Sequence, residues 1–498
     1  MLRVQKEIDF FNSAEIYDIV VPKDDFWRQT HDNIDFSEVV SMIIPYYSVK
    51  MGRGAYDPEV MLKLLILKEY YTLSDGDVIK MANVNMSMRY FLGMGITEQL
   101  PVKSTLSYFR KARVMNPGLV GKLLDKTLEL AVKLGMLKTE NGKILIKGVV
   151  DASHILSYGK KMLGADCLKL RIGELVKAME KLLGEPLRFE VRIPTSDEGG
   201  LPAIMSYAEE FVKKLRAEYP LQTAMDRVSR ILNRLEEELA DITERGYTSK
   251  DDHDARVGYK DRNSSFYGYK GHIMADLDSE LAVNARCTPG NANDTTEGKK
   301  MVDTVIAEDS GKKLEVLIGD TAYSSQDILA SGSKHGFKVY SRPNPNLGKC
   351  KATENGFIYN KDADSMQCPA DHLSVLTSTA YNKRYKSHIR RFYFDKNKCA
   401  DCPLRETCMV KASSGYKIDI QMLYKEQKEL LDRQKDDDYI AMRKRRPMIE
   451  RLNADLKRNQ SLRKAQTPGL PNVTLQLGVS LFTYNMRKIT KWQQKKIK

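Results

Sequence analysis

Two short apolar segments of the chain each lead into an aspartate. Residues 144–150 precede Asp151, and residues 313–319 precede Asp320. Runs rich in aliphatic and β-branched residues predict strands that are buried inside a sheet. Two neighbouring strands of this kind would hold both carboxylates at one rim, which is unfavourable unless a cation neutralises them. The alternative is that each aspartate caps a helix after an unrelated strand.

The N-terminal part of the chain has a helical pattern. Residues 25–135 predict several short helices, and the most apolar one starts where Asp57 can serve as N-cap and Pro58 as the first helical residue. Basic side chains lie among these helices: Arg89, Arg110, Lys111 and Arg113. Short helices with cations favour a DNA-binding domain of the helix-turn-helix type. A generic helical bundle is the alternative.

After Asp151 the strand pattern stops and later returns. Residues 160–246 have apolar positions every three or four residues, which predicts a helical hairpin. Strands are then predicted at 266–276 and 281–288, followed by a helix at 296–308 and the Asp320 strand. Three antiparallel strands that pass into α/β units are typical of the ribonuclease-H-like fold, in which the helix would bring the two Asp strands side by side.

Composition adds a partner class. The 498 residues suffice for two to four domains, and the net charge of +14 favours a polyanionic partner, most often nucleic acid. No apolar run approaches the roughly 20 residues that span a membrane. Because the N-terminus has no signal-peptide pattern, we expect a cytoplasmic protein.

A third carboxylate lies in a basic segment near the C-terminus. Residues 443–458 predict a helix introduced by Pro447, in which Arg446, Glu450 and Lys457 are four and seven residues apart and share one face. An exposed helix with intrahelical ion pairs is the alternative. The acidic residues 436–438 are expected to form a solvated loop.

Joined to Asp151 and Asp320, Glu450 would complete a set of three carboxylates. Such a set can hold two Mg²⁺ ions about 3.5–4 Å apart, which activate a nucleophile and stabilise the leaving oxygen of a displacement at phosphorus. Asp455 is not expected to belong to this set. It follows Glu450 by five residues, roughly 500° around a helix, so it points well away from the face that carries Glu450.

Several motifs in order resemble those of the DDE insertion-sequence transposases, particularly the group named after insertion sequence eleven-eighty-two, related to the IS-four and IS-five groups. The similar segments are residues 56–93, 268–272, 288–294, 319–323 and the signature Arg446-x3-Glu450-x6-Lys457. The tyrosine of that signature is not matched, because Arg443 stands in its place.

The resemblance implies a Mg²⁺- or Mn²⁺-dependent DNA transposase. Asp151, Asp320 and Glu450 would be its catalytic residues and metal ligands, and the flanking cations, which include Arg443, Arg446 and Lys457, would contact phosphates. The expected partners are the double-stranded DNA of the element ends and of the target, bound by a homodimer or higher oligomer at the nucleoid. Two alternatives remain: a transposase-derived DNA-binding protein without catalysis, and a ribonuclease-H-like nuclease without strand transfer.

Four late cysteines, Cys368, Cys399, Cys402 and Cys408, resemble the cysteine-bearing insertion common in this group. The spacing Cys399-x2-Cys402 followed by Cys408 suits a tetrahedral thiolate site, most naturally for structural Zn²⁺. Cys350 is a substitute ligand. The alternative is a set of reduced cysteines without metal.

The predicted fold is therefore α/β. It has a ribonuclease-H-like catalytic core, a helical N-terminal domain, a helical insertion after the first strand and a cysteine-bearing insertion before the last catalytic helix. The predicted boundaries are 1–136 for the N-terminal DNA-binding domain, 137–159 and 251–345 for the core, 160–250 and 346–430 for the two insertions, and 431–498 for the C-terminal catalytic helix and basic tail.

Overall fold

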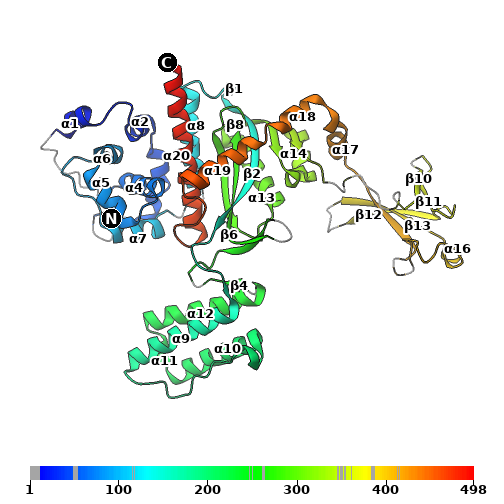
Figure 1. Ribbon diagram of the computed structural model, residues 1–498, viewed down its shortest axis with the longest axis horizontal. Coiled ribbons are helices and arrows are strands. Elements are labelled where there is room, and N and C mark those ends of the chain that lie inside the picture. Colours follow the sequence, from blue (N-terminus) through cyan, green and yellow to red (C-terminus); the bar gives the residue numbers. More distant parts are fainter. Residues whose placement is uncertain are drawn as a thin grey trace. The chain divides into compact units, whose positions relative to one another are not determined.

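The protein is described by a computed structural model (Figure 1). The structure describes residues 12–48, 54–114, 116, 118–245, 247–249, 251–260, 264–344, 347, 352, 355–360, 362–382, 387–411, 413 and 415–497. The chain forms two compact units. Unit 1 comprises Met1–Leu314 and Pro447–Lys498, and unit 2 comprises Glu315–Arg446.

An antiparallel sheet forms the centre of unit 1. Strand β2 (Lys143–Leu156) pairs with β6 (Ser265–Asp276), from Gly148 opposite Asp276 to Leu156 opposite Gly268. Strands β7 (Ala282–Pro289) and β5 (Arg256–Tyr259) also pair with β6, and β1 (Thr139–Glu140) pairs with β2. Almost every residue of β6 is buried, as expected for a strand with neighbours on both sides and helices packed over it. The three predicted antiparallel strands are thereby confirmed.

The helix α20 (Leu470–Ile497) packs along α8 (Leu119–Lys133) and against β7 (Figure 1). The Asn485 amide fixes this contact. Its Oδ1 accepts from the Ala282 backbone N–H at 2.7 Å, and its Nδ2 donates to the Ala282 carbonyl at 2.9 Å and to Thr127 Oγ1 at 2.8 Å. A buried amide that satisfies three backbone and side-chain groups orients the helix as well as stabilising it.

Short helices make up the N-terminal part of unit 1. They are α1 (Ser13–Val20), α2 (Phe26–Asn33), α3 (Ser37–Ser41), α4 (Pro58–Tyr71), α5 (Asp75–Val84), α6 (Met86–Leu92) and α7 (Lys103–Ala112). The predicted start of α4 is confirmed, because the Asp57 carboxylate accepts from the Glu59 N–H at 2.8 Å and Pro58 is the first helical residue. α4 is buried on all sides and packs on α20, which explains its continuous apolar sequence.

Three long helices occupy the segment between β2 and β5, where the sequence predicted a hairpin. They are α9 (Gly164–Leu183), α10 (Gly200–Glu218) and α12 (Asp226–Arg245), with a short α11 (Pro220–Thr223) and the strands β3 (Met162–Leu163) and β4 (Tyr247–Thr248) at their base. Their apolar faces share one core that includes Leu175, Phe211 and Leu235. Arg171 forms a fully buried ion pair with Glu238 inside this bundle, at 2.5 Å.

Unit 2 begins within β8 (Lys312–Gly319), which runs parallel to β9 (Lys338–Ser341) and is connected to it through α14 (Gln326–His335). The rest of the unit holds a hairpin, a three-stranded sheet and further helices. These are β10 (Ile358–Asn360), β11 (Ser365–Gln367), β12 (Leu376–Asn382), β13 (Ser387–Tyr393), β14 (Lys417–Gln421), α16 (Lys396–Ala400), α17 (Lys425–Asp432) and α18 (Asp437–Lys444). The last helix before α20 is α19 (Pro447–Asn459), in unit 1.

The buried ion pair of the bundle allows a stability test. Replacing Glu238 removes the fully buried partner of Arg171 and leaves it with Glu174, which is 2.7 Å away and partly exposed, so the cost should reach at most about 3 kcal/mol. We expect Glu238→Gln to lower the free energy of opening of amides in α9 and α12 by this amount, measured by hydrogen exchange. Glu236→Gln is the matched control, because Glu236 pairs with Arg216 at the surface and such pairs contribute about 0–1 kcal/mol. Equal effects of the two variants would contradict this assignment.

Candidate active site

Asp151 lies inside β2 and not at its end. The sequence placed it at the strand end because the apolar run stops there, but backbone pairing with β6 continues to Leu156. Asp151 stands opposite Ile273 in this register, and its side chain is half-buried. Because β2 remains paired with β6 beyond Asp151, the backbone of this residue is held more rigidly than it would be at a strand end.

The helix α19 packs directly on β2. Asn453 Nδ2 donates a hydrogen bond to Asp151 Oδ2 at 3.1 Å, and Met448, Ile449, Leu452 and Leu456 bury the rest of the helix face. Glu450 precedes Asn453 by three residues, about one turn, and is exposed. The strand of Asp151 and the helix of Glu450 are therefore adjacent elements of unit 1.

The chain that leaves α19 is also attached to β2. The Leu156 N–H donates to the Arg463 carbonyl at 3.0 Å, and the Ala465 N–H donates to the Leu156 carbonyl at 2.8 Å. The contact between α19 and β2 is thus fixed at two points, by the Asn453 side chain on the helix and by the backbone hydrogen bonds of Leu156 after it.

The predicted single basic helix is wrong. The structure has two helices, α18 and α19, separated at Arg445 and Arg446, because Pro447 cannot donate to the preceding turn and disfavours helical backbone in the residue before it. Arg446 therefore does not share a helix with Glu450, whereas Lys457 does. Arg443 lies in the last turn of α18, with its guanidinium 5.9 Å from the centre of the Tyr439 ring.

The acidic run before these helices is likewise not the loop that the sequence predicted. Asp437 and Asp438 form the first turn of α18, where carboxylates interact favourably with the helix dipole. Asp438 also accepts a hydrogen bond from the Tyr340 hydroxyl at 2.7 Å. Its role in unit 2 is structural.

Cations gather around Lys457, which itself interacts with Asp151 in unit 1. Burial lowers the pKa of Lys457. The positive charges of Lys260 and Arg463 lower this pKa further, whereas the Asp151 carboxylate raises it. Burial together with Lys457 and Lys260 lowers the pKa of His154 to about 4, so that this imidazole is neutral at pH 7. A half-buried lysine next to two further cations creates a positive potential that suits phosphate groups.

Asp320 directly follows β8 in unit 2 and is exposed. Its Oδ1 accepts from the Ala322 N–H at 2.9 Å and caps a short 3-10 turn, Thr321–Ser324. Capping, the alternative considered from the sequence, is thus one role of this carboxylate. Its approach to Asp151 and Glu450 stays a prediction.

Sequence reasoning missed a second acidic centre. Asp252, fully buried, accepts from Ser157 Oγ at 2.7 Å, from the Tyr158 N–H at 3.2 Å, from the Gly469 N–H at 3.1 Å and from the Tyr269 hydroxyl. Four donors saturate the carboxylate, so it serves as a structural anchor that joins the end of β2 to the start of α20. Its sequence context, a short polar segment, carries no signal of this burial.

Two histidines of the central sheet, one on β2 and one on β6, have structural surroundings. His272 is fully buried, with its Nε2 2.9 Å from Thr288 Oγ1. Burial is the main cause that lowers its pKa to about 4. The His154 ring packs 5.2 Å from the Phe266 ring.

The N-terminal cations divide into structural and accessible ones. Arg89 donates to the carbonyls of Gly95 and Glu98, and Arg110 forms a two-bond pair with Asp75; both arginines are buried. The Arg113 guanidinium lies 4.7 Å from the centre of the Tyr47 ring. Lys111 is exposed. Two of the four cations that suggested DNA binding thus stabilise the helices instead.

The late cysteines lie in one region of unit 2. Cys368, Cys399 and Cys408 pack against its small apolar core. Burial raises the pKa of the Cys399 thiol, and the nearby Cys368, Cys408 and Cys402 raise it further, which favours the protonated thiol. Cys350 lies outside the described residues.

Metal ligation is a separate question. Within the described part of the chain, no three His, Cys, Asp or Glu side chains form a group that could hold a metal ion. The predicted zinc site is therefore not supported.

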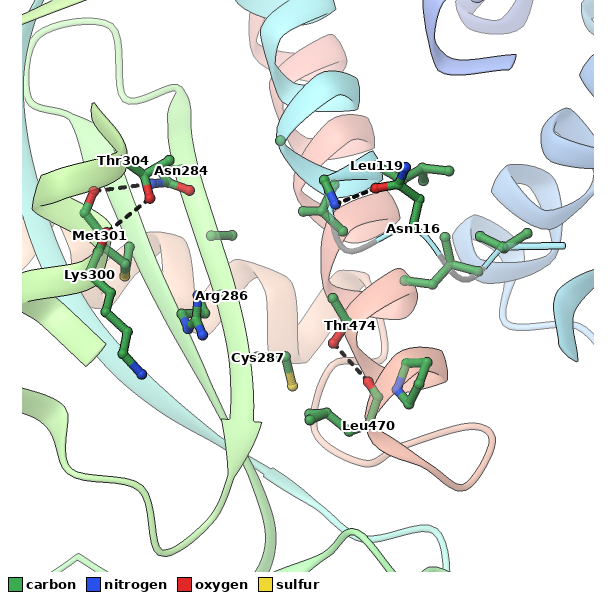
Figure 2. A pocket seen from close by; sticks show the side chains of 17 residues that line it. Asn116, Leu119, Asn284, Arg286, Cys287, Lys300, Met301, Thr304, Leu470 and Thr474 are labelled. Carbon is green, nitrogen blue, oxygen red and sulfur yellow. Dashed lines mark hydrogen bonds between the residues drawn. The ribbon is translucent and has the colours of Figure 1, made fainter. Parts of the chain in front are cut away.

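A pocket of about 410 Å³ lies between β7, α13 (Asp294–Ile306) and the first turns of α8 and α20 (Figure 2). Its wall is mostly apolar and includes Met301 and Cys287. The two cations Arg286 and Lys300 are both paired with Glu297. Neither Asp151 nor Glu450 lines this pocket, so it is not where the carboxylates act.

Comparison with known families defines the class. A family model described as "Transposase domain" matches residues 15–112, and one described as "Transposase DDE domain" matches residues 239–486. No match was found among curated proteins. None of the helices in the described ranges is long and apolar enough to span a bilayer.

The two matches cover about two thirds of the chain, and the DDE domain implies the ribonuclease-H-like α/β core. The chain belongs to the DDE transposases, which are enzymes of DNA transposition encoded by mobile elements. Asp320 and Glu450 lie within the second match, whereas Asp151 precedes it. The α9–α12 segment lies between β2 and the later strands of the sheet.

His272 gives a pH test of the sheet. Its pKa is about 4 in the folded chain and about 6.5 when unfolded, so the unfolded chain binds more protons between these values. Stability should be complete above pH 6.5 and fall as the pH drops towards 4, by at most about 1.4 kcal/mol per pH unit. His272→Gln should flatten this dependence, measured as unfolding midpoint against pH. His335→Gln, at an exposed position of α14, should retain the wild-type slope, and an unchanged slope in His272→Gln would refute the assignment.

Proposed function

We propose that this DDE transposase binds the terminal inverted repeats of an insertion sequence, cleaves DNA at the ends and joins the 3′ ends to target DNA. The observation that supports this best is the contact of α19 with β2, which brings the helix of Glu450 onto the strand of Asp151. The motif order favours the group named after insertion sequence eleven-eighty-two.

The side-chain types suit a hard divalent cation, although among the described residues these carboxylates do not form a group of three metal ligands. Asp151, Asp320 and Glu450 offer carboxylate oxygens, the ligand type that Mg²⁺ and Mn²⁺ prefer, and Asn453 adds a buried amide beside Asp151. When bound, such ions supply nucleophile activation and stabilisation of the leaving oxygen. Asp151, Asp320 and Glu450 are therefore the proposed catalytic residues and ligands.

The cations of unit 1 have a separate task. Lys457, half-buried on α19, together with Lys260 and Arg463 would neutralise DNA phosphates near Asp151 and hold the strand in position. Arg443 and Arg446 of unit 2 remain proposed phosphate contacts. Because two element ends must be joined, we propose that a dimer or higher oligomer assembles on DNA.

The carboxylates can be tested within one helix. Glu450→Gln should retain DNA binding but lose end cleavage by orders of magnitude, because a ligand is lost while size and shape are kept. Asp151→Asn and Asp320→Asn should behave alike, and double variants should be little worse than single ones. Asp455→Asn is the matched control on α19, since Asp455 accepts a hydrogen bond from Asn459 and should be dispensable.

The assays are nicking of DNA that bears an element end, with Mg²⁺ or Mn²⁺, and joining of pre-cleaved ends. Near-normal cleavage by Glu450→Gln would show that the triad is assigned wrongly. Cleavage without joining would indicate a nuclease, and binding without cleavage in the wild type would indicate a DNA-binding protein only.

The phosphate contacts have their own signature. Displaced counterions make the logarithm of affinity fall linearly with the logarithm of salt, with a slope that decreases by about one for each phosphate contact removed. Lys260→Gln should reduce the slope by about this amount, measured by titration of end DNA at several salt concentrations. Lys181→Gln removes an equal charge from an exposed position of α9 and should leave the slope unchanged. Identical slopes in all three proteins would exclude a Lys260 contact.

A further inference from the structure

Asn453 occupies an unusual position for an amide. It lies on the buried face of α19 among Ile449, Leu452 and Leu456, and the residue is only 9% exposed. Aliphatic residues are the expected occupants of such a position, because a buried amide costs free energy unless its polar atoms are hydrogen-bonded. The position therefore needs an explanation beyond packing.

One half of the amide is accounted for by Asp151. Asn453 Nδ2 donates to Asp151 Oδ2 at 3.1 Å. The opposite orientation of the amide would bring two oxygens together, so the donor must face the carboxylate when Asp151 is ionised. This bond fixes the carboxylate orientation from α19, the helix that also carries Glu450.

The other half is not accounted for. Asn453 Oδ1 is buried and accepts no hydrogen bond from the residues that the structure describes. An unsatisfied buried carbonyl oxygen costs about as much as a lost hydrogen bond, and such an atom in a folded protein calls for a specific partner. Glu450 lies one turn before Asn453 on α19 and Lys457 one turn after it, so the amide stands between a carboxylate and a cation of the same helix.

We propose that Asn453 is a positioning residue of the cation site. Its Nδ2 orients Asp151, and its Oδ1 accepts a hydrogen bond from water coordinated to a divalent cation at Asp151 and Glu450. This inference rests on the proposed function. It also explains how two carboxylates of unit 1, which form no metal site with a third His, Cys, Asp or Glu among the described residues, acquire a further oxygen donor.

The test measures metal affinity directly, by Mn²⁺ titration monitored by electron paramagnetic resonance, on the full chain. Asn453→Leu keeps the volume and the apolar packing but removes both polar atoms, and it should weaken Mn²⁺ binding about 10–100-fold, the usual effect of losing an outer-sphere partner. Cleavage at low Mn²⁺ should fall, and saturating Mn²⁺ should restore it in part. Asn459→Leu, at an exposed position of the same helix, should change neither quantity.

Asn453→Asp separates this role from a purely structural one. It has the same shape, loses the donor to Asp151 and retains an oxygen acceptor. If the oxygen serves the cation site, this variant binds Mn²⁺ at pH 8 at least as tightly as the wild type. Its unfolding temperature then also rises more on Mn²⁺ addition, because the cation relieves repulsion with Asp151.

Wild-type affinity in folded Asn453→Leu, or affinity in Asn453→Asp as weak as in Asn453→Leu, would overturn the proposal. Either result leaves the proposed function intact as long as the wild type cleaves with Mn²⁺ and Glu450→Gln does not. A wild type that neither binds Mn²⁺ nor cleaves would instead remove the proposed function, and this inference with it.

Discussion

The long antiparallel pairing of β2 with β6 is the constraint on which the candidate site depends. It carries Asp151 within a continuous strand, and it sets where the chain must go before and after that strand. At the end of β2, the Leu156 backbone holds the segment that follows α19, and Asp252 ties the adjoining turn to the start of α20. The helix of Glu450 and the segment that follows it are thereby attached to the strand of Asp151, although they are far apart in the sequence.

Charged side chains in this protein have two roles, structural or accessible to a ligand, and the degree of burial distinguishes the two groups. Arg89, Arg110 and Asp252 are buried and hydrogen-bonded to groups of neighbouring elements, so they stabilise particular helices and turns. Lys457 is half-buried. Burial is the main cause that lowers its pKa, and the neighbouring Lys260 and Arg463 lower it further, so positive charge is concentrated here. A net charge of +14 therefore does not by itself locate a DNA-binding surface, because some of the cations are already neutralised by internal partners.

Pro447 marks both a helix start and a boundary between the two units of the chain. It begins α19, and it is also the residue at which the chain returns from unit 2 to unit 1. Since a proline restricts the residue before it and cannot donate to the preceding turn, the helix that carries Glu450 starts independently of α18. The consequence is that the cations before Pro447 and those after it belong to different parts of the molecule.

Local pattern alone determined the elements of this protein to a large extent. Alternation and apolar runs located β2, β6, β7 and β8, and the cap and proline at residues 57 and 58 located α4. These features depend on neighbours within a few residues, so the sequence contains them. The motif order also indicated the family, which the domain matches confirm.

The tertiary structure alone decided which polar groups lie inside. The burial of Asp252, the contact of Asn453 with Asp151 and the engagement of Arg110 by Asp75 each join residues that are distant in sequence. The break between α18 and α19 had a local signal in Pro447, but the continuous run of cations concealed it. Burial and long-range hydrogen bonding depend on how elements pack, and a carboxylate or amide has the same local pattern whether it is exposed or enclosed.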